Sequence, residues 1–171
     1  MMRRHIGLGA RGAAIAALAL VLSACFQRAT TPEPPAGTAA GGKESAVPDP
    51  VRSRIVFTAL QMVGVPYRYG GETPEGFDCS GLVQYAYREA GIHVPRTALE
   101  QLHSSAPIPL ADAGPGDLLF FRSKDNSHVG IYLGQGRFVH APSTGSRVSI
   151  ASFSDPYYRR NFLRAGRMPD L

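Results

Sequence analysis

Apolar residues recur at helical spacing in the part of the chain that follows residue 50. Between residues 51 and 63 they predict an amphipathic helix that ends before Gly64 and has an apolar face formed by Ile55, Val56, Ala59, Leu60 and Val63. Further along, Thr97 and Glu100 stand three residues apart, which is the spacing of a capping box. A short helix is therefore expected near Gln101 and Leu102.

Another helix is predicted to begin at Cys79, within the stretch Gly76-Phe77-Asp78-Cys79-Ser80-Gly81. Asp78 is a good N-cap residue because its side chain can accept a hydrogen bond from an unpaired N–H of the first turn. Gly91 is placed to end this helix, and the apolar positions that share one of its faces are Leu82, Val83, Ala86 and Ala90.

The position of Cys79 at a helix start has chemical consequences. Unpaired N–H groups there favour a thiolate, whereas an ionised Asp78 disfavours it, so a nucleophilic Cys79 would need a base. The alternative is that Cys79 is one more small buried apolar residue, as most free cysteines are.

A strand-like pattern replaces the helical one after the turn Pro115-Gly116-Asp117. Residues 118–121 predict a buried strand, and residues 128–133 and 137–141 predict a hairpin joined by Gly134-Gln135-Gly136. Residues 148–150 and 160–167 can add further strands. Helices followed by strands indicate an α+β fold, in which N-terminal helices pack on an antiparallel sheet.

The first 25 residues have the pattern of a secretory signal. A basic start containing Arg3, Arg4 and Arg11 precedes a short apolar run over residues 15–22. The ending Leu22-Ser23-Ala24-Cys25 resembles the lipobox of bacterial lipoproteins, in which the cysteine is lipidated; the alternative is an ordinary signal peptide that contains a cysteine. Phe26 after it is compatible with export to the outer membrane of a Gram-negative cell.

Two further regions follow the predicted signal. Residues 26–50 are rich in Pro, Thr, Ala and Gly and are expected to form a flexible tether, because they contain too little apolar surface to fold. Residues 51–171 are long enough for one small domain with a core.

Charge and cysteine content narrow the possible functions. The formal net charge of +5 falls to +2 without the three arginines of the signal, which is too small to indicate a nucleic-acid partner. A later arginine cluster is expected to be a solvated strand face: Arg159, Arg160, Arg164 and Arg167. The chain has two cysteines, so lipidation of Cys25 would leave Cys79 without a disulfide partner. A lone thiol in an oxidising compartment is more easily explained by use than by packing.

The predicted hairpin places two histidines on one face of the sheet. With a three-residue loop, Leu133 pairs with Arg137 and Gly130 lies opposite His140, which makes His128 and His140 diagonal neighbours. One imidazole can then accept the thiol proton while the other orients it. A zinc site is a weaker interpretation because neither Cys-x-x-Cys nor His-Glu-x-x-His occurs, and a pair of ordinary sheet histidines is a further alternative.

Several separated motifs together resemble the NlpC-type (NlpC/p-sixty) cell-wall cysteine peptidases, and the resemblance covers essentially all of residues 51–171. In chain order they are Tyr67-Arg68-Tyr69-Gly70-Gly71, Gly76-Phe77-Asp78-Cys79-Ser80-Gly81-Leu82-Val83-Gln84, Pro95-Arg96-Thr97, Pro115-Gly116-Asp117-Leu118, His128-Val129-Gly130-Ile131-Tyr132 and Phe138-Val139-His140-Ala141.

The resemblance implies a papain-like core that hydrolyses amide bonds in peptidoglycan stem peptides, with no cofactor and no metal. It implies Cys79 as nucleophile, His128 as base and His140 as the residue that orients the base. Its expected substrate-binding residues are Tyr67, Asp78, Ser80 and Arg96; for Tyr67 and Arg96 a structural role is the alternative, in which Arg96 braces the following helix.

The expected protein is a monomeric peptidase anchored through Cys25 at the periplasmic face of the outer membrane. Two other functions stay open at this point. One is a catalytically silent lipoprotein that binds the cell wall or scaffolds other hydrolases. The other is a thiol-dependent acyl or amide transferase.

Overall fold

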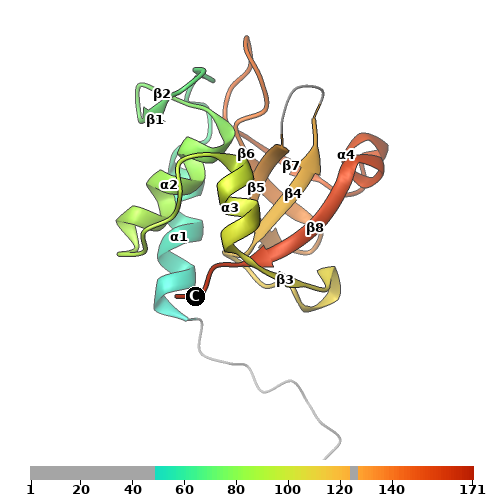
Figure 1. Ribbon diagram of the computed structural model, residues 1–171. Coiled ribbons are helices and arrows are strands. Elements are labelled where there is room, and N and C mark those ends of the chain that lie inside the picture. The colour runs from blue at the N-terminus through green and yellow to red at the C-terminus, as the bar shows by residue number, and fades with distance from the viewer. Residues whose placement is uncertain (1–48, 124–126) are drawn as a thin grey trace, which may run out of the picture. The chain divides into compact units, whose positions relative to one another are not determined.

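The computed structural model describes residues 49–123 and 127–171 (Figure 1). The predicted signal peptide with Cys25, and the predicted tether up to residue 48, lie outside the described residues. None of the helices in the described ranges is long and apolar enough to cross a membrane.

Four α-helices occur in the described part of the chain, and each has a capped start. They are α1 (Pro50–Gln61), α2 (Cys79–Glu89), α3 (Ala98–Ser104) and α4 (Pro156–Asn161), with a 3-10 turn η1 (Leu110–Asp112) between α3 and the main strands. The side chains of Asp49, Asp78 and Asp155 accept hydrogen bonds from first-turn N–H groups of α1, α2 and α4. The capping box of Thr97 and Glu100 is formed at the start of α3, as predicted.

Six strands form one antiparallel sheet in the order β3-β8-β4-β5-β6-β7. Their bounds are Ala106–Ile108 for β3, Leu118–Arg122 for β4, Ser127–Gly134 for β5, Arg137–His140 for β6, Ser149–Ser152 for β7 and Phe162–Arg167 for β8. A separate short hairpin, β1 (Glu72–Thr73) and β2 (Gly76–Phe77), comes directly before α2.

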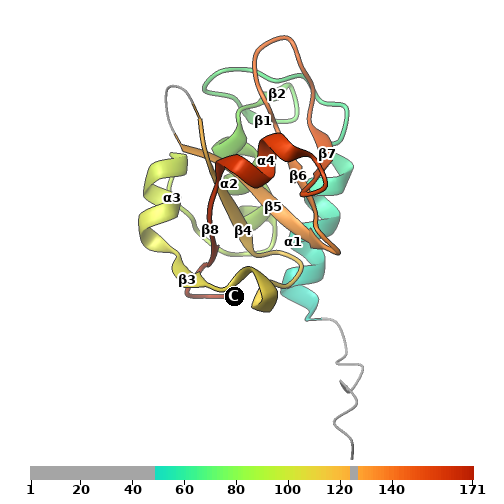
Figure 2. The same cartoon turned by 90° about the vertical axis from the view of Figure 1, so that its right-hand side faces the viewer.

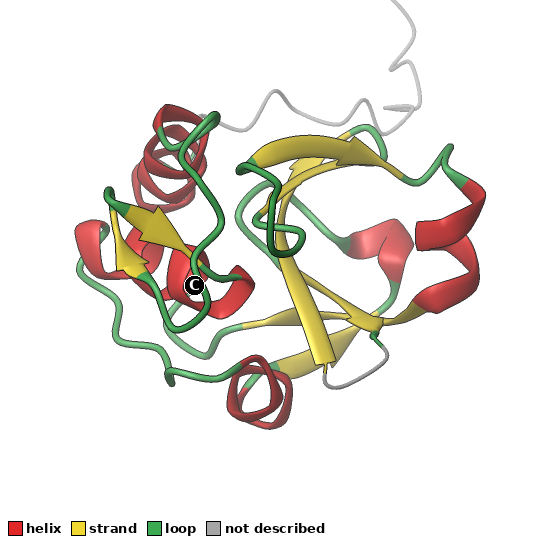
Figure 3. Ribbon diagram, turned by 90° about the horizontal axis from the view of Figure 1, so that it is seen from above, coloured by secondary structure: helices red, strands yellow, loops and turns green. Residues whose placement is uncertain are grey.

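The sheet has helices on both faces. Helices α1, α2 and α3 cover one face, and α4 lies against the other face (Figures 1 and 3). Alternation along β5 and β6 sends Val129, Ile131 and Val139 into the main core under α1 and α2. Tyr132 and Phe138 point the opposite way, into a smaller aromatic cluster beneath α4, which Figure 2 shows crossing that face.

The predicted α+β class is confirmed, with two local differences. The first helix ends at Gln61 rather than at residue 63, and Leu60 and Val63 are 38% and 44% exposed instead of buried. In the hairpin, Gly134 rather than Leu133 pairs with Arg137, because a β-bulge shortens the loop to Gln135-Gly136.

The late arginine cluster is not a solvated strand face. Arg159 and Arg160 are exposed on α4, whereas the two arginines on β8 bind within the domain. Arg164 donates to the carbonyl oxygen of Ser105, and Arg167 binds the buried carboxylate of Asp117. Arg52 of α1 binds the same carboxylate, so Asp117 ties the first helix to the last strand.

Candidate active site

Cys79 is the first residue of α2, directly after the N-cap Asp78. The β1–β2 hairpin leads the chain into this position, and the backbone just before β1 lies close to the first turn of α2. A Cβ atom at Gly81 would overlap the carbonyl oxygen of Gly71, so only glycine fits. The backbone before β1 therefore packs directly against the first turn of α2, which begins with Cys79.

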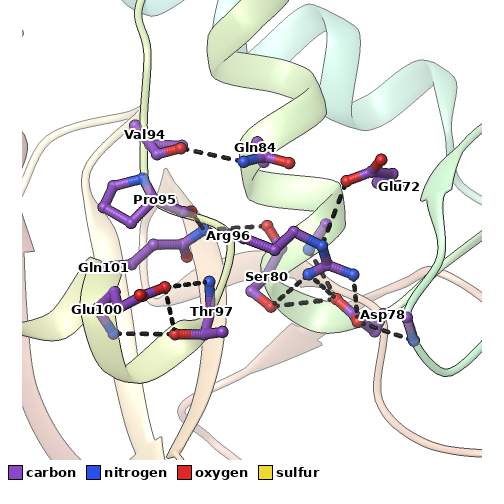
Figure 4. A network of polar contacts seen from close by, with 12 residues as sticks. Glu72, Asp78, Ser80, Gln84, Val94, Pro95, Arg96, Thr97, Glu100 and Gln101 are labelled. Carbon is purple, nitrogen blue, oxygen red and sulfur yellow. Dashed lines mark hydrogen bonds and ion pairs between the residues drawn. The ribbon is translucent and has the colours of Figure 1, made fainter.

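Asp78 is the centre of a hydrogen-bond network that fixes this helix start (Figure 4). Its Oδ1 accepts from the Gly81 N–H at 2.7 Å, the Ser80 hydroxyl at 3.1 Å and Arg96 Nη1 at 3.0 Å. Its Oδ2 accepts from the Gly70 N–H at 3.1 Å and Arg96 Nη2 at 2.7 Å. Burial raises the pKa of Asp78, but these donors outweigh burial and hold the pKa below its ordinary value.

Arg96 connects the entry of α3 to the start of α2. Beyond its paired contact with Asp78, its Nη1 donates to Ser80 Oγ at 3.1 Å and its Nε lies 3.3 Å from a carboxylate oxygen of Glu72 (Figure 4). The fully buried Gln101 of α3 adds a second connection, donating from Nε2 to the carbonyl oxygens of Ser80 and Pro95. These bonds tie the start of α2 to α3 and to the segment that enters it.

The two hairpin histidines meet as the alternation of side chains requires. Nε2 of His128, on β5, lies 2.8 Å from Nδ1 of His140, on β6. Gly130 leaves the space for this pair, because a Cβ atom there would lie 2.7 Å from Phe138 Cδ2 and 3.4 Å from His140 Cβ. His128 is partly exposed, whereas His140 is 1% exposed and lies behind it.

Tyr158 of α4 is the second hydrogen-bond partner of His140. Its hydroxyl oxygen lies 3.3 Å from His140 Nε2, and the two rings are edge to face with centroids 5.4 Å apart. Phe121 and Phe138 pack against the Tyr158 ring on the sheet side. Three side chains thus form one hydrogen-bonded series, from His128 through His140 to Tyr158.

Burial dominates the ionisation of the thiol and the imidazoles. It raises the pKa of Cys79, although backbone N–H groups, that of Val129 foremost, act in the opposite direction. Burial lowers the pKa of His128 to about 4 and, together with the neighbouring imidazole, lowers that of His140 to about 3. The resting site at neutral pH therefore contains an uncharged thiol and two uncharged imidazoles.

A cleft of about 810 Å³ opens over the thiol. Most of the residues predicted from the sequence line it: Tyr67, Asp78, Cys79, Ser80, Arg96 and His128. Burial raises the pKa of Tyr67, and the Asp78 carboxylate, together with Cys79 when it is ionised, acts in the same direction, so the Tyr67 hydroxyl stays a hydrogen-bond donor at neutral pH. His140 does not line the cleft but supports His128 from behind. In residues 49–123 and 127–171 no group of three or more His, Cys, Asp or Glu side chains is arranged to hold a metal ion.

Three residues of this site were not predicted from the sequence. Glu72 and Gln101 reach it through side-chain contacts between segments that are distant along the chain, and no local pattern signals such contacts. Tyr158 lies in a stretch that the sequence assigned to no element; the Asp155-Pro156 pair before it, an N-cap residue followed by proline, was the available signal for a short helix.

Comparison with known proteins agrees with this geometry. Residues 64–167 match the model of the NlpC/P60 family. The chain is 45% identical over 116 residues to the murein DD-endopeptidase MepH of Escherichia coli, covering 64% of this chain but only 43% of MepH. It is 38% identical to the E. coli murein DD-endopeptidase MepS/murein LD-carboxypeptidase over 173 residues, covering 92% of each protein.

A solved structure shows the same fold. The lipoprotein-like NLP/P60 protein of Staphylococcus aureus superposes with a TM-score of 0.66 at 36% identity, over 73% of this chain and 44% of that one. The fold, the family match and the relatives agree, and the chain belongs to the NlpC/P60 family.

Proposed function

We propose that this protein is a peptidoglycan hydrolase that cleaves amide bonds in stem peptides with Cys79 as the nucleophile. The observation that carries the proposal is that Cys79 and His128 line one cleft, with His140 hydrogen-bonded to Nε2 of His128. The names of the relatives MepH and MepS, which describe murein peptidases, support the substrate class.

The chemistry follows from which nitrogen is available. Because Nε2 of His128 is engaged by His140, Nδ1 is the nitrogen left to accept the thiol proton. The sulfur then bonds to the scissile carbonyl carbon, and the π electron pair moves to the carbonyl oxygen. Collapse of this adduct breaks the C–N bond, and the proton on His128 passes to the leaving amine. Water, deprotonated by the same imidazole, hydrolyses the thioester and regenerates the thiol.

The neutral resting pair fits this sequence of steps. Cys79 does not need to be a thiolate at rest, since its proton transfers to His128 as the sulfur attacks. The developing oxyanion has two candidate donors, the Cys79 N–H at the start of α2 and the hydroxyl of Tyr67, which lines the same cleft.

Asp78, Ser80 and Arg96 form the cleft wall beside the nucleophile. Asp78 already accepts five donors, so a substrate amine that binds it would have to displace one of them. The Arg96 side chain is 31% exposed and offers the wall's positive charge to a stem-peptide carboxylate. In this proposal Asp78 holds the side chains of Ser80 and Arg96 in place, and these two side chains contact the substrate.

A lipid anchor on Cys25 is the second part of the proposal. It would hold the domain at the periplasmic face of the outer membrane, and residues 26–50 would give the domain reach toward the wall. Metabolic labelling with a fatty-acid analogue tests it: Cys25→Ser should lose the label while the domain keeps its activity. Equal labelling of both proteins would refute the anchor.

Mass spectrometry of muropeptides released from purified sacculi tests the activity and identifies the bond that is cut. Wild-type protein should release products, and Cys79→Ser and His128→Ala should release nearly none while keeping the wild-type melting temperature. His140→Asn should retain measurable turnover, because asparagine keeps a polar partner for His128. Wild-type protein that binds sacculi without releasing products would favour a silent wall-binding role. Products extended by a new amide would favour a transferase.

A further inference from the structure

The buried His140 has a partner at each ring nitrogen, and this constrains where the protons are. A neutral imidazole carries one N–H donor and one bare acceptor nitrogen. Nδ1 of His140 faces Nε2 of His128, and Nε2 of His140 faces the Tyr158 hydroxyl. The three groups must therefore donate in the same direction along the series.

The two possible directions have opposite chemical consequences. If Tyr158 donates to His140, then His140 donates to Nε2 of His128, and the proton of His128 stays on Nδ1, where it blocks uptake of the thiol proton. If Tyr158 accepts from His140, then His140 Nδ1 accepts from His128, and Nδ1 of His128 is bare. Only the second direction allows His128 to act as a base.

We propose that Tyr158 is a positioning residue, whose hydroxyl accepts the Nε2–H of His140 and thereby selects the tautomer in which Nδ1 of His128 is free. The inference rests on the proposed function, since it assigns a role within that mechanism. Once His128 has taken the thiol proton, the same direction of donation stabilises the imidazolium, because each N–H along the series already points away from the positive charge.

The surroundings of Tyr158 leave few other groups to set this direction. The rings that pack on it from β4 and β6 are those of Phe121 and Phe138, which carry no titratable group. On its own helix, Asp155 and Tyr157 act on it, and burial is the larger influence that raises the pKa of Tyr158. On the strands of the sheet the nearby titratable groups are His140, which Tyr158 contacts, and His128, which binds His140 in turn.

The helix α4 supplies a matched control. Tyr157 is adjacent to Tyr158, is 52% exposed, and packs edge to face against it. Tyr158→Phe and Tyr157→Phe each remove one hydroxyl and keep the ring, so a general effect of losing a tyrosine hydroxyl from α4 would appear in both variants.

The first measurement is the imidazole tautomer by two-bond ¹H–¹⁵N correlation spectra, recorded at neutral pH on the inactive Cys79→Ser protein. His128 and His140 should both be protonated at Nε2, and Tyr158→Phe, but not Tyr157→Phe, should introduce a mixture of tautomers. This result needs no turnover, so it is separate from success or failure of the proposed function. A proton on Nδ1 of His140 in the protein that keeps Tyr158 would overturn the proposal, even if the phenylalanine variant did not fold.

The second measurement is the pH dependence of kcat and kcat/KM on one defined muropeptide. Tyr158→Phe should lower kcat about 10-fold to 100-fold with little change in KM, because the lost acceptor matters most when His128 is charged. The acid limb of kcat/KM should move to lower pH, since the imidazolium is less stabilised. Unchanged kcat and an unmoved acid limb would show that Tyr158 only packs against His140.

Discussion

Replacement of Arg96 by methionine tests whether the Asp78 carboxylate, next to Cys79, depends on its ion pair with Arg96. The side chain of Asp78 is 13% exposed, and Arg96 donates two parallel hydrogen bonds to it, at 3.0 and 2.7 Å. A hydrogen bond to a charged group contributes about 1.5–3 kcal/mol to stability, and loss of one partner of a fully buried pair costs about 3–5 kcal/mol. Because Arg96 is 31% exposed, we expect Arg96→Met to lose about 2–3 kcal/mol.

The same change should affect catalysis through the thiol. Without Arg96 the negative charge of Asp78, adjacent to Cys79, is less compensated and raises the pKa of the thiol further. A rise of about one pKa unit corresponds to about 1.4 kcal/mol, so kcat/KM should fall about 10-fold. Asp78→Asn keeps a good N-cap residue but removes the charge, so the double variant should recover part of both losses.

Urea denaturation and kcat/KM on a defined muropeptide, measured for both single variants and the double variant, give the coupling energy directly. Arg88→Met is the matched control, since Arg88 lies near the other end of α2, is 52% exposed, and pairs with the adjacent Glu89 at 4.0 Å. It should lose less than about 0.5 kcal/mol. If the effects of Arg96→Met and Asp78→Asn are additive, the ion pair does not stabilise the start of α2 and the reasoning is refuted.

Three further changes have defined outcomes. Asp117→Ala should lower the free energy of unfolding, measured by urea denaturation, by about 3–5 kcal/mol, because it leaves two arginines without their fully buried partner. The control Asp170→Ala, at an exposed position, should be near neutral. Equal effects would contradict the buried clamp. The folded-state pKa of His128, about 4, is below the ordinary value of 6.5, so the unfolded state binds more protons and the melting temperature should fall as pH drops through that window. His140→Asn should flatten this dependence, because the pKa of His140 is lowered as well; an unchanged slope would mean that the His140 imidazole is not neutral in the folded protein. Gly81→Ala should lower kcat/KM more than 10-fold, since its methyl group must displace the loop before β1; wild-type activity would show that the loop adapts.

The pairing of the two histidines was predictable because it depends on alternation alone. Side chains on a strand alternate with a period of two, so a register that places Ile131 opposite Val139 places His128 and His140 on one face. The loop was predicted incorrectly, since Gln135 adopts a positive φ of 55° in a two-residue turn for which glutamine gives no signal. The bulge between Tyr132 and Gly134 absorbs this difference and leaves the register at the histidines unchanged.

Contacts between distant segments were not predictable in this way. The helix starts were found because Asp78 and Thr97 cap N–H groups a few residues away, which is a local interaction. The clamp on Asp117 joins Arg52 and Arg167, which are 65 and 50 residues away from it. The positive charge of Arg167 was visible in the sequence, but its direction into the domain depends on the packing of β8 beside β4.

The ionisation of the site affects how the free thiol of Cys79 reacts with oxidants. A thiolate is the form of cysteine that oxidants attack, so a free thiol that stays protonated reacts with them more slowly. Burial raises the pKa of Cys79 and lowers that of His128, so the free enzyme holds its thiol in the less reactive, protonated form. In the proposed mechanism a bound substrate supplies the electrophile that makes proton transfer to His128 productive, and His140 and Tyr158 then support the imidazolium. In the proposed mechanism, the hydrogen-bonded series behind His128 supports this base at the step in which a peptide bond in the cleft makes the Cys79 thiol a nucleophile.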